Sequence, residues 1–187
     1  MSDTSTQTAD AASTPQSTPQ DTPLGDAALT PIQMLAIALA YMIDADKVHE
    51  AEERAELVVV FNKMVTRGEF NKQGLAEVIA KAFTYIKDTD IDTFLAIAAE
   101  KLAPLQKAAV FINALDLMLS DGQVNGGETA ILKKIQDAFG IDRDMVMAIR
   151  EVIFAKNDTR MFLHPEHPRN ASDAFLRINY RQGPSNE

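Results

Sequence analysis

Cysteine is absent from the 187-residue sequence. Its absence excludes disulfide bonds, thiolate metal sites and thiol redox chemistry in this polypeptide, whatever its compartment. The sequence also contains no Gly-x-Ser-x-Gly motif and no glycine-rich loop that would bind a phosphate between a strand and a helix. No activated nucleophile can therefore be named, and we expect a protein that is not an enzyme.

Long apolar runs and clusters of basic residues are missing too. The longest unbroken apolar run, Met34 to Ile43, has ten residues, about half of what a membrane span needs. No basic segment precedes an apolar one at the N-terminus, so we expect no signal peptide and a cytoplasmic location. The formal net charge of −9 argues against nucleic-acid binding and weakens adsorption on anionic membranes. Cations are the expected small partners.

Composition divides the chain into three parts. Residues 1–27 are rich in Ser, Thr, Gln, Asp and Pro with hardly an apolar side chain, so we expect a disordered tail. Residues 28–158 form the expected helical domain, because apolar residues make up 46% of the sequence and suffice for a core. Residues 159–187 form a C-terminal extension, with a short helix expected from Ser172 to Tyr180.

Apolar periodicity within the domain predicts helices and no strand, which makes the fold class all-α. The segment from Ala108 to Leu119 is apolar except at Asn113 and Asp116, so we expect it at the centre of a compact bundle. Asp116 is expected to be buried on this helix and to find a partner on a facing helix. The seven predicted helices cover about 31–44, 50–65, 72–87, 92–102, 104–119, 128–139 and 143–155.

The sequence is organised around an acidic corner, Asp121-Gly-Gln-Val-Asn-Gly-Gly-Glu128, which follows the central helix. Gly122 is a helix stop, and Asn125 with Glu128 reads as the capping box of the next helix. An earlier segment repeats the plan, because Leu29-Thr-Pro-Ile-Gln33 matches Leu102-Ala-Pro-Leu-Gln106. The bundle is therefore expected to consist of two related helical halves, with Phe111, Leu115 and Met118 facing Leu35, Leu39 and Met42 of the other half.

The pattern Asp121-Gly-x-Val-x-x-x-Glu128 after an apolar helix resembles the bacterial tellurite-resistance TerB family, also seen at the N-terminus of DjlA co-chaperones. The resemblance covers about residues 29–158. It implies a TerB-like binding module in bacterial stress or tellurite resistance. The alternative is a structural or docking subunit that uses the fold and its tails within a larger protein assembly. A co-chaperone role lacks support, since no His-Pro-Asp tripeptide occurs.

The acidic corners are candidate sites for Ca²⁺ or Mg²⁺, because hard cations prefer oxygen ligands. Asp121 and Glu128 are the predicted main ligands, with Asp46 and Glu52 assisting. An EF-hand is contradicted, since Leu132 stands where a bidentate Glu is required. The other interpretation is structural, because carboxylates in a first helical turn stabilise the helix N-terminus. Both interpretations remain open.

The C-terminal extension contains a candidate partner-binding segment. Phe175, Leu176, Ile178 and Tyr180 are too apolar for a solvated tail, so this segment is expected to fold back on the bundle or to dock on a protein partner. His164-Pro-Glu-His167 could suggest zinc, but proline interrupts the pair and the sequence does not predict a zinc site.

Overall fold

The computed structural model of the chain describes residues 29–45, 57–62, 68, 71–120, 126–172 and 174. These residues are largely helical and include no strand, which confirms the all-α fold class. Residues 57–62 are also helical. The remaining helices are α1 (Pro31–Asp44), α3 (Lys72–Asp88), α4 (Ile91–Lys101), α5 (Pro104–Met118), α6 (Gly126–Phe139), α7 (Arg143–Asn157) and α8 (Arg160–Leu163), followed by a 3₁₀ turn at Pro168–Asn170.

The two helices that begin the proposed halves, α1 and α5, start in the same way. The Gln33 side-chain oxygen accepts a hydrogen bond from the Thr30 backbone N–H at 2.8 Å, and Gln106 accepts one from the Ala103 backbone N–H at 2.9 Å. A buried leucine precedes each cap and a proline follows it. The glutamine thus satisfies a backbone donor at the start of each helix. The sequence repeat therefore corresponds to two helix starts that have the same geometry.

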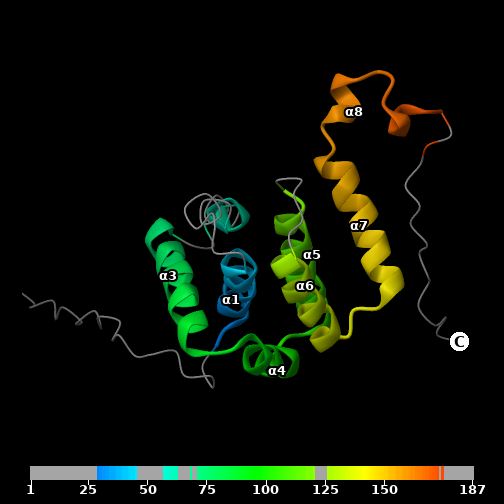
Figure 1. Ribbon diagram of the computed structural model, residues 1–187. Coiled ribbons are helices and arrows are strands. Elements are labelled where there is room, and N and C mark those ends of the chain that lie inside the picture. Colours follow the sequence, from blue (N-terminus) through cyan, green and yellow to red (C-terminus); the bar gives the residue numbers. More distant parts are fainter. Residues whose placement is uncertain are drawn as a thin grey trace, which may run out of the picture.

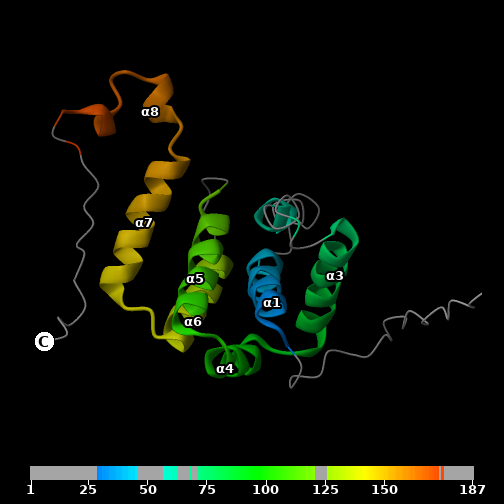
Figure 2. The ribbon, with the colours of Figure 1, turned by 180° about the vertical axis from the view of Figure 1, so that it is seen from behind.

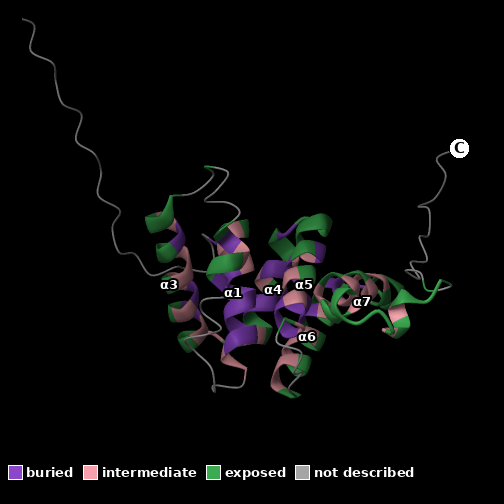
Figure 3. Cartoon of the chain, turned by 90° about the horizontal axis from the view of Figure 1, so that it is seen from above, coloured by how far each residue is buried: buried purple, intermediate pink, exposed green. Residues whose placement is uncertain are grey.

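Helix α1 lies at the centre of the bundle, between α3 and α5, with α6 against both α1 and α5 and α4 crossing one end (Figures 1 and 2). Seen along the bundle, the buried residues gather where α1, α4, α5 and α6 meet, whereas α7 lies to one side (Figure 3). Helix α1 is buried over most of its length, while α5 leaves Leu105 and Ile112 exposed. The expectation that the segment from Ala108 to Leu119 is buried nearly all round was therefore wrong, since Ile112 lies within it and is 38% exposed.

The predicted contact between the two halves is confirmed. Helix α1 packs along α5, and the apolar side chains expected there belong to one core cluster. The buried members are Phe111, Leu115, Met118, Leu39 and Met42, and Leu35 is half-buried against them.

Asp90 is the N-cap of helix α4, a role that the sequence analysis did not identify. One oxygen of Asp90 accepts hydrogen bonds from the backbone N–H groups of Asp92 and Thr93, each at 3.0 Å. The other oxygen accepts from the Thr93 hydroxyl at 2.6 Å. These bonds, led by those from Thr93, lower the pKa of the Asp90 carboxyl below its usual value. Asp90 is thus a charged N-cap of α4.

This cap predicts a stability that depends on acid pH. Because the folded protein favours the Asp90 carboxylate, the contribution is complete above the unfolded pKa of about 3.9 and is lost as the pH falls through the lower folded pKa. The melting temperature of the unmodified protein should therefore fall more steeply between about pH 5 and pH 2 than that of Asp90→Asn, since asparagine caps without titrating there. Identical profiles would contradict this role.

Several predicted boundaries need correction at the C-terminal end. The last domain helix extends to Asn157, and α8 and the 3₁₀ turn were not predicted. The helix expected from Ser172 does not begin there, because Ser172 and Ala174 are not helical and the Ala174 N–H bonds to the Ala171 carbonyl in a turn, 2.9 Å away. The N-terminal tail 1–27 and most of the helix predicted at 50–65 lie outside the described residues.

None of the helices in the described residues has both the length and the apolar character required to cross a membrane.

Candidate acidic site at one end of the bundle

The helices that precede the two acidic corners end at the same end of the bundle. Helices α1 and α5 run in the same direction side by side, and α6 starts where α5 ends (Figures 1 and 2). Asp44, the last residue of α1, and Glu128, in the first turn of α6, therefore lie at this end. We call it the corner end, defined by Asp44, Ser120 and Gly126.

Of the four predicted metal ligands, only Glu128 is among the described residues. Asp121, Asp46 and Glu52 lie outside them, as does the predicted Asn125 cap. Glu128 is half-buried in the first turn of α6, where a carboxylate also stabilises the helix N-terminus. Within the described ranges, no three His, Asp or Glu side chains gather closely enough to hold a metal ion. The metal site therefore stays a prediction.

Asp116 joins α5 to α7 near the corner end. Its carboxylate forms an ion pair with Lys156 and accepts a hydrogen bond from the Asn157 side-chain amide at 3.0 Å. The predicted partner on a facing helix is therefore confirmed. The expectation that Asp116 is buried was wrong, since 32% of its side chain is exposed. A half-exposed, paired carboxylate of this kind positions the end of α7.

A shallow hollow lies between α4 and α6. It encloses about 440 Å³ and is lined by Asp92, Lys134, Asp137 and small apolar side chains. Lys134 and Asp92 form an ion pair across it at 2.6 Å, and Asp137 pairs with Lys133. The charged groups at its rim thus already have partners, and the Lys134–Asp92 pair joins α6 to α4.

A family model described as tellurite resistance protein TerB matches residues 33–151. This match extends over well more than half of the chain. The chain belongs to the TerB family. Comparisons with curated proteins and with solved structures found no match. The match includes both acidic corners and the helices from α1 to most of α7, and it lies within residues 29–158, to which the sequence resemblance had been assigned.

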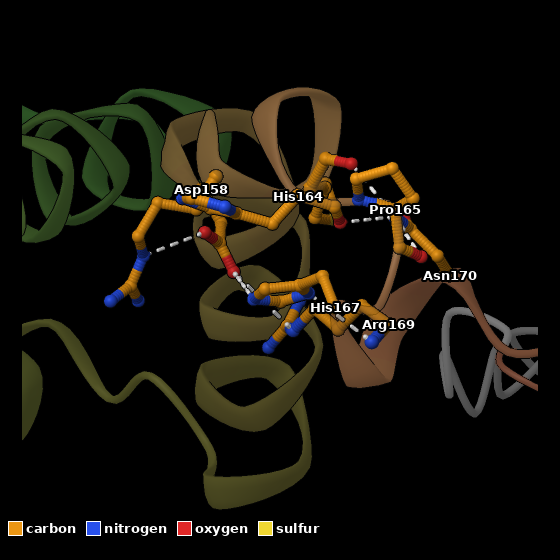
Figure 4. A network of polar contacts seen from close by, with 8 residues as sticks. Asp158, His164, Pro165, His167, Arg169 and Asn170 are labelled. Carbon is orange, nitrogen blue, oxygen red and sulfur yellow. Dashed lines mark hydrogen bonds and ion pairs between the residues drawn. The ribbon is translucent and has the colours of Figure 1, made fainter.

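Beyond the TerB match, residues 158–170 form what we call the return loop, because the chain turns back toward α7 (Figure 4). Asp158, only 14% exposed, is its centre. The carboxylate pairs with the Arg160 Nε at 3.3 Å, the His167 Nε2 at 3.4 Å and the Arg169 Nε at 4.0 Å. One nearly buried carboxylate thus collects three basic side chains.

Hydrogen bonds made by His167 and Asn170 also fix the return loop. His167 Nδ1 accepts a hydrogen bond from the Arg169 backbone N–H at 3.2 Å, so the neutral ring carries its proton on Nε2, which faces Asp158. The Asn170 side-chain amide donates to the carbonyls of Met161 at 2.8 Å and His164 at 3.1 Å. Sequence reasoning weighed the histidines as zinc ligands and missed this network, for which no local pattern gives a signal.

The predicted partner-binding residues Phe175, Leu176, Ile178 and Tyr180 follow this loop and lie outside the described residues.

Proposed function

We propose that this TerB protein is a non-enzymatic binding module in bacterial stress or tellurite resistance, and that its corner end binds a divalent cation, Ca²⁺ or Mg²⁺. Asp121 and Glu128 are the proposed main ligands, and Asp46 and Glu52 assist. The non-enzymatic part of the proposal is supported by the chain's lack of cysteine and of a recognisable nucleophile motif.

One observation carries the cation proposal: α1 and α5 are parallel neighbours that end together. Chain connectivity keeps the Cα atom of Asp121 within about 3.8 Å of that of Ser120, and Asp46 within two residues of Asp44. Both acidic corners therefore start from one end of the bundle. Carboxylates concentrated in this way repel one another, and a hard cation with oxygen ligands relieves the repulsion.

The test is a titration of the full chain with Ca²⁺ and with Mg²⁺, followed by backbone NMR. We expect millimolar cation to shift amide signals on both sides of the two corners, at Asp44, Ser120 and Glu128, because weak sites of few carboxylates bind in about that range. The double variant Asp121→Asn, Glu128→Gln should lose these shifts. Glu100→Gln is the matched control, since it removes an exposed carboxylate from α4 at the opposite end.

Two outcomes would reject the cation site. Unshifted corners in the unmodified protein would show that the carboxylates act as helix caps alone. Shifts that persist in the double variant, or that disappear in Glu100→Gln as well, would show that Asp121 and Glu128 are not the ligands.

A second candidate function, a docking subunit of a larger protein assembly, is favoured by a separate observation on α8. Phe162 and Leu163 are 85% and 71% exposed, on a loop that lies outside the TerB match. Large apolar side chains at such exposure are typical of anchors that a protein partner buries.

The docking function predicts that a protein that co-purifies with the chain from its native host is lost from Phe162→Ser, Leu163→Ser. Leu105→Ser is the matched control, because Leu105 is 80% exposed on α5 and lies within the TerB match. Retention of the same partner by the double variant would exclude α8 as the anchor. This result is independent of the cation titration, which concerns the corner end.

A further inference from the structure

Helix α7 has a partly apolar side that the bundle does not cover. Its inner side packs on the core through Val146, Ile149 and the buried Ile153. Met147, Arg150 and Phe154, at intervals of three and four residues, share another side, and we call these three residues the α7 flank. Met147 remains 49% exposed there, although it lies within the region that matches TerB.

The return loop covers one end of the α7 flank. The guanidinium carbon of Arg169 lies 6.0 Å from the centre of the Phe154 ring, and that of Arg150 lies 5.0 Å from it. Both distances fit cation–π contacts, and Phe154 is half-buried as a result. Met147 is two helical turns from Phe154, about 10.5 Å along the axis. The flank is thus covered at Phe154 and open at Met147.

The chain that leaves the return loop is long enough to reach the open part. Thirteen residues follow Ala174, and the first six of them include Phe175, Leu176, Ile178 and Tyr180. Arg169, already above Phe154, is five residues before Ala174, and Phe175 follows Ala174 directly. The six residues from Phe175 to Tyr180 span about 9 Å as a helix or up to about 20 Å when extended. These lengths are comparable to or greater than the distance of about 10.5 Å from Phe154 to Met147 along α7.

We propose that residues 175–180 dock on the α7 flank of the same molecule, where Phe175, Leu176, Ile178 and Tyr180 cover Met147 and the exposed edge of Phe154. The segment continues the course of the return loop along α7. Arg150 of the flank and the neighbouring Glu151 on α7 are opposite in charge, respectively, to Asp173, which comes just before the segment, and to Arg177, which lies within it. Pairs of opposite charge across such a contact fix its register.

The docked segment explains why the C-terminal extension is apolar without requiring a partner for it. It adds a layer to α7 outside the TerB match and holds the return loop against the helix. The exposed Phe162 and Leu163 of α8 remain outside this contact, so the inference is independent of the docking function proposed for them.

The experiment compares two methionines of α7 in the full chain. Met145 and Met147 have similar exposures, 38% and 49%, but they lie on different sides of the helix. Their methyl signals, assigned with single Met→Leu variants, are followed by NMR while a soluble paramagnetic agent is added. We expect Met147 to be protected from the agent and Met145 to be accessible, since only Met147 lies under the docked segment.

Substituting Phe175→Ser and Ile178→Ser together in the full chain should remove this protection and leave Met145 unchanged. The control Phe162→Ser, Leu163→Ser should leave the protection intact. Equal accessibility of both methionines in the unmodified chain would overturn the inference. So would protection of Met147 that increases with protein concentration, because the segment would then be docking on a second copy of the chain.

Discussion

Replacing Phe94 by alanine is expected to lower the free energy of unfolding by about 3–5 kcal/mol. Phe94, on α4, is 1% exposed, and its ring lies 5.7 Å from that of Tyr41 on α1 and 6.1 Å from that of Tyr85 on α3. The substitution therefore removes a buried ring and two aromatic contacts at the junction of three helices. Urea denaturation measures the loss.

Tyr41→Phe is the matched control for this prediction. The Tyr41 hydroxyl donates a hydrogen bond to the Thr89 carbonyl at 2.6 Å, and burial, followed by the nearby Tyr85 and Asp90, raises the pKa of Tyr41 well above its usual value. This variant keeps the ring and loses one hydrogen bond, so it should cost about 1 kcal/mol. A cost for Phe94→Ala as small as that of the control would show that α4 does not pack on α1 and α3.

Leu115→Ala should also be strongly destabilising, by about 2–5 kcal/mol. Leu115 is 3% exposed on α5, in the cluster that joins the two halves of the bundle, and its neighbours can fill the resulting cavity only in part. Thermal and urea unfolding with the same protein preparation would measure the change.

The control for Leu115 lies on the same helix. Ile112 is 38% exposed, so Ile112→Ala should lower the free energy of unfolding by about 1 kcal/mol or less. The leucine and isoleucine side chains that the two substitutions shorten are similar in size. Equal costs at the two positions would mean that α5 does not present Leu115 to α1, and that the duplicated halves do not share this core.

The local features of the fold could be predicted from the sequence. Apolar spacing of three and four residues located α1, α3, α4, α6 and α7 to within a few residues, because that spacing is what places side chains on one face of a helix. The paired helix starts could be read as well, since Thr30 and Gln33 are three residues apart and meet within one turn. The TerB resemblance rested on such a local pattern at Asp121 and Glu128.

The position of the candidate site depended on how the helices pack, and the local sequence patterns do not give that packing. The sequence supplied two acidic corners, but only the parallel packing of α1 on α5 brings the ends of both helices to one end of the bundle. Periodicity locates the face of a helix and does not give the direction in which two helices separated by sixty residues run past each other. The predicted cation site and its structural alternative therefore looked alike at the level of sequence.

The C-terminal part of the molecule was decided by tertiary structure. Asp116 meets Lys156 and Asn157 across about forty residues of chain, and Asp158 collects basic side chains through a turn that has no helical period. Arg169 reaches Phe154 only because the chain reverses after α8. Helix formation depends on neighbours within one or two turns, so the sequence determined it, whereas contacts between distant charged and aromatic groups exist only once the helices have packed.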